Sequence, residues 1–445
     1  MECLLREIKD SIGKNDDFIQ MDQQLGDLQV QYLGLKSLLD FPKTILAIKE
    51  NLGSESLNRE AVLKQLSTMG VLKKQEKNEL ISSILEGKLI IYIKNERESA
   101  VTVDPISQTL TRGIESPANE NVLQGPLSSF NEEIQINTGL IRKQIVSENL
   151  QVRSYSIGTS QKKSLSLLYC NDHVNLNLLQ KIIFQIEKNL TMDLNNAQDV
   201  SKLMGISFWS VISPFTTTEV PQEASMSLLK GRIVLLVDRM PFAMILPSVL
   251  WDMFANENDR NFPFPLMVSI RSLRIIGLLM TLIIPGLYVA LVSVNPEVLR
   301  IELALSIAQS REGVPYPALI EMIIMLLILE LIIEASVRLP KSIGPTITMV
   351  GGIILGQAAV EAKLVSNLLI IILAATTIAN STIIGFQNSI SIRLFKYIIL
   401  IFASIYGVLG ILAGIFFICI YLASINTLGV PFLYINFSKD EIKSG

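Results

Sequence analysis

The segment from Arg311 to Gly344 limits what this chain can fold into more than any other part of it. Between Pro317 and Pro340 it holds an almost wholly apolar run, A-L-I-E-M-I-I-M-L-L-I-L-E-L-I-I-E-A-S-V-R. About 20 apolar residues in a helix cross the hydrocarbon core of a bilayer. Proline is tolerated at the start of a helix but not in its interior. The segment therefore predicts a membrane-spanning helix over Ala318–Arg338.

Three glutamates interrupt this apolar helix. An ionisable side chain at mid-bilayer costs roughly 3 kcal/mol on insertion scales, so such residues usually face other helices or a hydrated path. Glu330 and Glu334 are four residues apart and share a face that Arg338 continues. Two interpretations remain open: a cation-attracting face beside an ion path, or a structural ion pair of Glu334 with Arg338. Glu321 lies on the opposite face near the helix end, where we expect a structural role.

Hydropathy divides the chain into two halves. The mean hydropathy is +0.44, and the stretches 275–296, 364–392 and 397–438 contain no charged residue. The first 270 residues are instead rich in Lys, Glu, Asn and Gln. A net charge of −3 gives no electrostatic reason to expect nucleic-acid binding. We therefore expect a soluble N-terminal half followed by a polytopic membrane half.

The predicted fold class is α/β or α+β in the N-terminal half, in two small subdomains, followed by an all-α membrane domain of four to five helices. The expected boundaries are 1–125 and 126–270 for the subdomains, 271–437 for the membrane domain and 438–445 for a polar tail. Helices are expected at 57–69, 75–85, 127–149 and 175–190, and strands at 88–94, 100–103, 164–169, 233–237 and 242–246. Residues 111–125 are predicted to be a connector, and no internal repeat is visible.

Five apolar stretches are expected to span a membrane: 273–294, 318–335, 343–360, 364–385 and 397–423. Five crossings with the N-terminus inside place most of the basic residues beside the spans on the cytoplasmic side, as the positive-inside rule requires. The first residues, M-E-C-L-L-R-E-I-K-D, contain no apolar signal-peptide core. The N-terminal half is thus expected to be cytoplasmic.

Polar and small side chains inside the later spans have two possible roles each. Thr376, Asn380 and Gln387 recur at helical spacing and could line a hydrated path, although hydrogen bonding between helices is the commoner role of any one of them. Two G-x-x-x-G motifs permit close helix packing or contacts between subunits. The assembly candidates are Gly352, Gly356, Gly410, Gly414, Arg271, Arg274, Arg311 and Arg338.

Nothing in the sequence favours an enzyme. His173 is the only histidine, and the three cysteines are far apart. There is no P-loop, no G-x-G-x-x-G and no H-E-x-x-H motif. We expect no catalytic residues, no cofactor and no metal site.

Several motifs, in order along the chain, resemble those of the spore germination receptor A subunits, the GerA family. They are R-G-I-E-S-P-A-N-E-N-V-L-Q-G-P, N-T-G-L-I-R, T-E-V-P-Q-E-A-S-M-S-L-L-K-G-R-I-V-L-L-V-D-R-M-P-F, L-I-I-P-G-L-Y-V-A-L, S-I-A-Q-S-R-E-G-V-P-Y-P, E-A-S-V-R-L-P-K-S-I-G, G-G-I-I-L-G-Q-A-A-V and L-G-V-P-F-L. The similarity covers nearly the whole chain, from about residue 15 to 435.

The resemblance implies a subunit of a nutrient germinant receptor in the inner membrane of bacterial spores. It implies as partners a transporter-like B subunit and a lipoprotein C subunit, and assembly of A subunits into a ligand-gated cation channel. An ion-coupled secondary transporter and a non-conducting scaffold that docks a nutrient-binding subunit are the alternatives. No inverted repeat supports a transporter.

This chain departs from the family pattern at three places. Asp238-Arg239 stands where the hairpin usually carries Asp-Gly, and Arg is costlier than glycine in a turn that needs a positive φ. Ile333 stands in place of an expected arginine, and the residues 380–384 replace a usual S-F-x-x-P.

Overall fold

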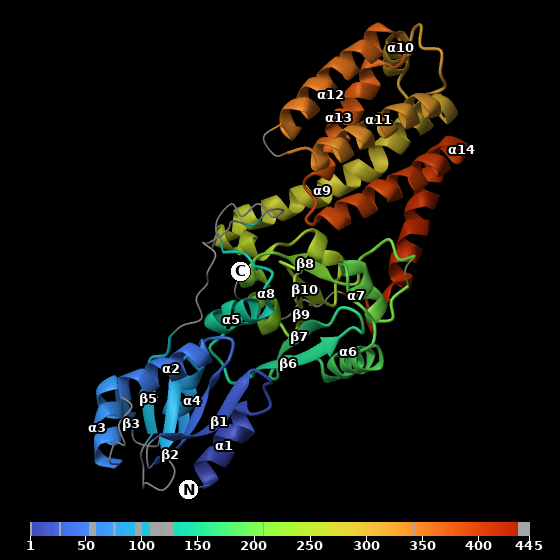
Figure 1. Ribbon diagram of the computed structural model, residues 1–445. Helices are drawn as coiled ribbons and strands as arrows, with labels where there is room; N and C mark the ends of the chain where they lie inside the picture. Colours follow the sequence, from blue (N-terminus) through green and yellow to red (C-terminus); the bar gives the residue numbers. More distant parts are fainter. Residues whose placement is uncertain are drawn as a thin grey trace. The chain divides into compact units, whose positions relative to one another are not determined.

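A computed structural model describes residues 2–25, 28–52, 59–73, 77–93, 100–106, 117, 128–207, 209–340 and 343–434 (Figure 1). The chain forms two compact units, one of residues 1–210 and 214–248, and one of residues 211–213 and 249–445. The first unit is built from sheets and helices and the second almost wholly from helices, so the predicted fold class is confirmed. The predicted connector 111–125, apart from Pro117, and the tail 438–445 lie outside the described residues.

The first subdomain is a five-stranded antiparallel sheet with helices on both faces. Its strands are β1 (Phe18–Leu25), β2 (Leu28–Leu35), β3 (Gly70–Lys73), β4 (Leu89–Ile93) and β5 (Ala100–Val103), in the order β1-β2-β4-β5-β3. Its helices are α1 (Glu2–Ile12), α2 (Phe41–Leu52), α3 (Arg59–Met69) and α4 (Lys77–Leu85). Strand β4, L-I-I-Y-I, is apolar throughout because it faces a core on each side. Ile91 packs with α2 and α3, and Ile90 packs with α1 and α4.

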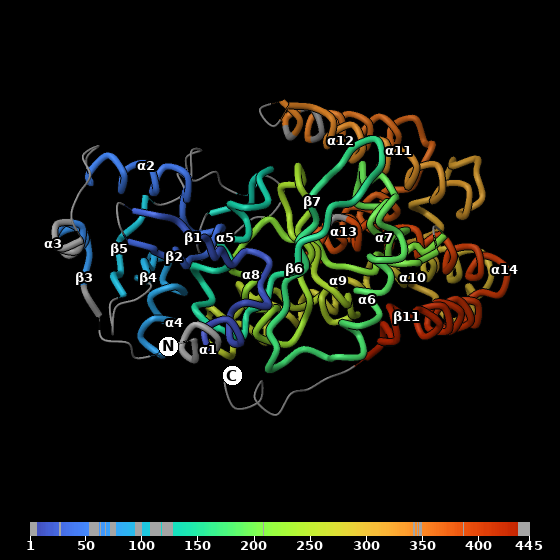
Figure 2. Tube along the Cα trace, turned by 60° about the horizontal axis from the view of Figure 1, so that its bottom comes forward, coloured from blue at the N-terminus to red at the C-terminus, as the bar shows by residue number. Residues whose placement is uncertain are grey.

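The second subdomain repeats the same topology. Its strands are β6 (Leu150–Ile157), β7 (Lys163–Cys170), β8 (Thr216–Thr218), β9 (Ile233–Val237) and β10 (Ala243–Leu246), in the order β6-β7-β9-β10-β8. Its helices are α5 (Ile134–Gln144), α6 (Leu176–Lys188), α7 (Ala197–Leu203) and α8 (Pro221–Leu229). Helices α5 and α8 cover one face of the sheet, and α6 and α7 lie on the other (Figures 1 and 2).

Both subdomains therefore follow one pattern, helix, two strands, two helices, strand, helix, two strands. The expectation of no internal repeat is wrong at the level of structure. The helix predicted over 127–149 is also shorter than expected: α5 ends at Gln144, and strand β6 starts at Leu150.

The β9–β10 hairpin has the strained turn that its sequence suggested. Arg239 has φ +64°, in the left-handed region that costs an L-residue roughly 1–2 kcal/mol. Its backbone N–H donates to the carbonyl of Glu132 at 2.8 Å, so the turn is fastened to the start of the subdomain.

The second unit begins with two short 3₁₀ turns (Leu250–Met253 and Glu257–Asn261) and the long helix α9 (Phe264–Val289). Helix α9 continues as a π-helical turn (Ala290–Val294), and a 3₁₀ turn (Pro296–Val298) follows. The remaining helices are α10 (Ile301–Ser310), α11 (Ala318–Arg338), α12 (Gly344–Glu361), α13 (Asn367–Asn380) and α14 (Phe386–Ser424). The short strands β11 (Asn426–Thr427) and β12 (Val430–Pro431) close the unit. Helix α11 has the bounds that its flanking prolines predicted.

Two of these helical segments are long and apolar enough to cross a membrane by length and composition, namely 264–294 and 387–424. The apolar segments Met349–Glu361 and Asn367–Asn380 are shorter. Pro285 lies inside α9, where its missing N–H removes one backbone hydrogen bond of the helix.

Helix α14 is a hairpin of two antiparallel arms, because Gly407 breaks it with φ +64° and ψ −139°. Two aromatic pairs pack between the arms. The ring centroids of Phe402 and Phe417 are 6.2 Å apart, and those of Phe395 and Tyr421 are 5.8 Å apart. Figure 1 shows the two arms of α14 meeting at a sharp bend. The expected span 397–423 therefore contains the bend at Gly407.

The helices of this unit run between two ends. At the near end (residues 249–262, 380–391 and 421–434), the Leu250 N–H donates to the Phe432 carbonyl at 3.0 Å, and the Ile384 N–H donates to the Met253 carbonyl at 3.2 Å. At the far end (residues 290–317 and 361–367), the Val408 N–H donates to the Asn295 side chain at 3.1 Å. Helix α14 therefore begins and ends at the near end, and its bend at Gly407 lies at the far end.

Candidate functional site

Helix α11 places its three glutamates in three different surroundings. Glu321 and Glu330 are nine residues apart, which is about 13 Å along a helix axis and half a turn round it. Glu334 follows Glu330 by one turn. The structure therefore does not gather these carboxylates at one place.

Glu321 is fully buried at the far end of the unit, 0 % exposed. Its carboxylate accepts a hydrogen bond from the Ser366 N–H at 2.6 Å and faces the Arg311 guanidinium at 3.4 Å. The Ser366 hydroxyl lies 3.0 Å from the Tyr288 hydroxyl and caps α13 through the Leu369 N–H. This network ties α9, α11, α13 and the loop after α10 together, in line with the structural role expected for Glu321. The ion pair of Arg311 with Glu321 is therefore a contact within one chain.

Glu330 bridges from α11 to the first arm of α14. One of its oxygens accepts from the Arg393 guanidinium at 2.6 Å and the other from the Lys396 ammonium at 3.2 Å. The side chains are 26 %, 12 % and 10 % exposed for Glu330, Arg393 and Lys396. A mostly buried carboxylate needs such partners, because an unpaired charge in an apolar setting is costly.

Glu334 forms a different kind of pair. Its carboxylate accepts from the Arg338 guanidinium at 2.6 Å one helical turn away, and both side chains are exposed. An exposed pair of this spacing contributes about 0.3–0.5 kcal/mol in water. Glu334 and Arg338 are therefore available on the surface of the unit rather than packed between its helices.

The polar face predicted on the fourth span is split. Thr376 is buried, and its carbonyl accepts from the Thr281 hydroxyl of α9 at 3.3 Å. Asn380 is buried, and its amide donates to the Ser389 hydroxyl of α14 at 2.8 Å. Its amide oxygen has no hydrogen-bond partner among the described residues. Gln387 is exposed. Thr376 and Asn380 thus connect neighbouring helices within this chain. Gln387 is not part of the same buried polar face.

The two glycine motifs also differ in their surroundings. A Cβ on Gly410 or Gly414 would come within about 3 Å of the backbone of Phe402 or Ile399, so this motif lets the arms of α14 pack together. A Cβ on Gly352 or Gly356 would meet nothing within 4 Å. The motif of Gly352 and Gly356 therefore lies on an open face of α12.

Arg271 and Arg274 meet a single buried carboxylate at the near end. The Arg274 guanidinium contacts both oxygens of Asp259, at 2.5 and 2.8 Å, and donates to the Phe254 carbonyl at 2.8 Å. Arg271 lies 3.5 Å from the same carboxylate. These arginines fasten the start of α9 to the turn before it.

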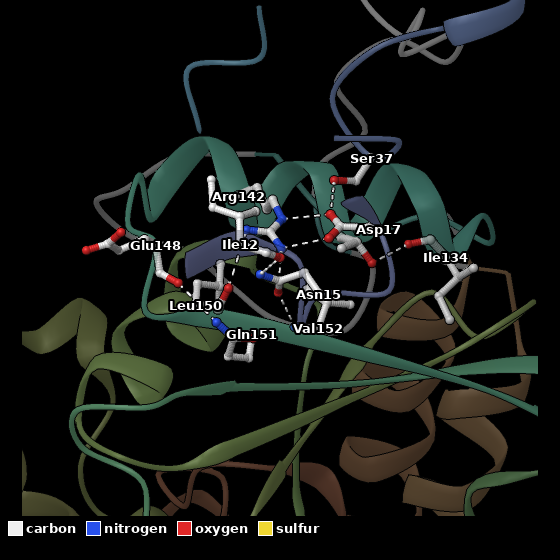
Figure 3. Close-up of polar contacts among 11 residues, drawn as sticks. Ile12, Asn15, Asp17, Ser37, Ile134, Arg142, Glu148, Leu150, Gln151 and Val152 are labelled. Carbon is white, nitrogen blue, oxygen red and sulfur yellow. Dashed lines mark hydrogen bonds and ion pairs between the residues drawn. The ribbon is translucent and has the colours of Figure 1, made fainter. Parts of the chain in front are cut away.

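A buried network that the sequence did not suggest joins the two subdomains of the first unit (Figure 3). The Arg142 side chain of α5 is 2 % exposed and contacts both carboxylate oxygens of Asp17, at 2.7 and 2.8 Å. It also donates to the Asn15 side-chain oxygen at 3.0 Å, and the Ser37 hydroxyl donates to Asp17 at 2.8 Å. A basic residue in the last turn of an apolar helix gave no sign of its distant partner.

The loop before β1 also covers the edge of the second sheet. The Asp16 N–H donates to the Val152 carbonyl at 3.0 Å, the Val152 N–H to the Asn15 side chain at 2.8 Å, and the Ser154 N–H to the Asp16 carboxylate at 2.6 Å. Strand β6 is an edge strand, and unpaired edges invite unwanted strand pairing. The first subdomain therefore satisfies part of the edge of the second.

Among the described residues, no group of three or more His, Cys, Asp or Glu side chains is placed to hold a metal ion. His173 lies in the turn after β7, where its backbone N–H donates to the Cys170 carbonyl at 3.2 Å. Burial raises the pKa of the Cys170 thiol to about 11, with the nearby Asp172 adding to the shift. A thiol in that state is a poor nucleophile at neutral pH.

The family model of the Bacillus/Clostridium GerA spore germination protein matches residues 6–444 of this chain. The spore germination protein GerLA of Bacillus cereus is 31 % identical over 437 residues, which cover 96 % of this chain and 88 % of that protein. The spore germination protein A1 of Bacillus subtilis (strain 168) is 28 % identical over 423 residues, with 95 % and 87 % covered.

A crystal structure of the N-terminal domain of the A subunit of the Bacillus megaterium spore germinant receptor GerK3 was also matched. The TM-score is 0.41 and the sequence identity 21 %, over 55 % of this chain and 94 % of that one.

Proposed function

Because this chain belongs to the GerA family of spore germination proteins, we propose that it is the A subunit of a nutrient germinant receptor. The family match over nearly the whole chain carries this proposal. The apolar helices of the second unit, together with the family, indicate membrane association. We place the second unit in the inner membrane of the spore and the first unit on the cytoplasmic side.

We further propose that several copies assemble into a ligand-gated cation channel. The open face of α12 at Gly352 and Gly356 supports assembly, because small residues let helix backbones approach closely in a membrane. Glu334 and Gln387 are exposed and can face other copies. The ion path is assigned to Glu330, Glu334, Thr376, Asn380 and Gln387, and a B subunit resembling a transporter and a lipoprotein C subunit are the proposed partners.

Within this proposal Glu330 is the gating candidate. It is partly exposed and is paired with two cations of α14. A shift of α11 against α14 would break these pairs and leave the Glu330 carboxylate free to attract cations in the path. Thr376 and Asn380 already have partners inside the chain, so their contribution requires a similar rearrangement.

The test is cation flux in liposomes that contain the purified chain with its B and C subunits. A channel conducts down a gradient when the nutrient is added, a transporter exchanges substrate against an ion, and a scaffold does neither. Glu330→Gln should alter the nutrient-dependent flux. Glu302→Gln, which removes an exposed carboxylate of α10, is the control and should leave it unchanged. Nutrient binding by the complex without any flux would refute the channel.

A further inference from the structure

The cluster of Glu330, Arg393 and Lys396 carries an excess of positive charge. Two cations meet one carboxylate, so one positive charge has no partner in the cluster. Among the residues that the structure describes, neither cation forms an ion pair with a second carboxylate. Removing a charge of this kind from water is unfavourable unless an opposite charge compensates it.

The same cluster also has unused hydrogen-bond donors. The Arg393 Nε and the Tyr397 hydroxyl are buried and have no hydrogen-bond partner among the residues that the structure describes. One interaction with Glu330 uses one of the three N–H groups of Lys396. Positions 393, 396 and 397 are neighbours on one face of a helix. The Lys396 ammonium lies 5.4 Å from the Tyr397 ring centre. Unused donors and an uncompensated charge thus occur on one helix face.

The surface beside the cluster is apolar. Leu327 and Leu331 flank Glu330 on α11 and are 53 % and 69 % exposed, and Leu394 and Ile401 on α14 are exposed as well. Arg393 lies two turns inside the first arm of α14, near the end where that arm begins. A basic site between membrane helices close to one end is the kind of place that binds lipid head groups.

From this charge, these donors and these surroundings, we infer that Arg393, Lys396 and Tyr397 form a binding site for a singly charged phosphate group. One phosphodiester supplies one negative charge and several acceptor oxygens, which matches the surplus of the cluster in both respects. The phosphate can come from an anionic phospholipid or from free inorganic phosphate. The inference does not depend on conduction by the protein.

Three variants separate phosphate binding from a purely structural role of the cluster. Lys396→Met leaves Glu330 and Arg393 as a neutral pair and should remove the binding. Glu330→Gln raises the surplus to two positive charges and should strengthen it. Arg300→Gln removes an exposed cation at the far end and should leave it unchanged. A structural role alone would lower the stability of the first two variants without changing their response to lipid.

The measurement is the apparent melting temperature of the full chain in neutral detergent, with phosphatidylglycerol, phosphatidylcholine or inorganic phosphate added. Phosphatidylglycerol should raise it by about 5 °C near saturation, and phosphatidylcholine, whose phosphate is neutralised by choline, should have little effect. Native mass spectrometry would count the bound molecules. A rise with inorganic phosphate alone assigns the site to the free anion. The inference fails if Lys396→Met responds to both anions as the unchanged protein does.

Discussion

Replacing Arg142 with methionine tests the buried network that joins the two subdomains. Methionine keeps much of the side-chain volume but removes both contacts to Asp17 and the contact to Asn15. Within the described part of the chain, the Asp17 carboxylate then keeps only the Ser37 hydroxyl as a side-chain partner. Breaking a buried ion pair in this way typically costs about 3–5 kcal/mol, because an unpaired charge stays buried. We expect the free energy needed to open the junction of the subdomains to fall by about 3–5 kcal/mol.

Hydrogen exchange of the full chain in detergent measures this opening locally. The Val152 and Ser154 amides are reporters, because their N–H groups donate to Asn15 and Asp16 across the junction. A loss of about 3–5 kcal/mol corresponds to exchange that is faster by roughly 10²–10⁴-fold for amides that open with the junction. Amides of β9 in the middle of the second sheet should be affected much less.

Two further variants make the reasoning refutable. Adding Asp17→Asn to Arg142→Met removes the stranded charge and should restore part of the protection. Lys43→Met breaks the exposed pair with Asp40 and should change stability by no more than about 0.5 kcal/mol. If Arg142→Met leaves the Val152 and Ser154 amides as protected as before, the network does not hold the subdomains together.

Three other changes probe single features of the chain. Gly407→Ala should destabilise the helical unit by about 3 kcal/mol, because of its positive φ and a Cβ that would strike Asn295; thermal unfolding in detergent, with Gly352→Ala as the neutral control, measures this. Arg239→Gly should stabilise the first unit by about 0.5–1 kcal/mol, because glycine adopts φ +64° without strain; a lower midpoint in urea would contradict it. Cys170 should resist alkylation at pH 8 in the folded protein and react after unfolding, because its folded pKa is raised to about 11; equal rates measured by mass spectrometry would refute this.

Local signals in the sequence predicted individual elements well. The bounds of α11 follow from an apolar run between prolines, and both strands of the β9–β10 hairpin follow from short apolar runs. By contrast, β1 reads F-I-Q-M-D-Q-Q-L, which is too polar to stand out. It is a strand because β2 pairs with it along its whole length. The two subdomains share the order of their helices and strands. No repeated pattern of residues in the sequence indicates this shared order.

Long-range contacts account for what the sequence could not predict at the candidate site. The spacing on α11 placed Glu330 and Glu334 on one face, but it could not indicate that Arg393 and Lys396, on a helix much later in the chain, would pair with Glu330 alone. Gly407 looked like any glycine in an apolar helix. Its role depends on Asn295, whose side chain accepts from the N–H that begins the second arm.

The bend at Gly407 also bears on how this polypeptide would enter a bilayer. Since the Leu250 N–H donates to the Phe432 carbonyl, the first and last segments of the helical unit lie at the same end of its helices. On the proposed membrane placement, neither flanking segment has to be translocated. Only the far-end residues 290–317 and 361–367 and the bend at Gly407 have to pass through the lipid. Impermeant labels directed at residues 255 and 434 should then react from the same side of a sealed vesicle.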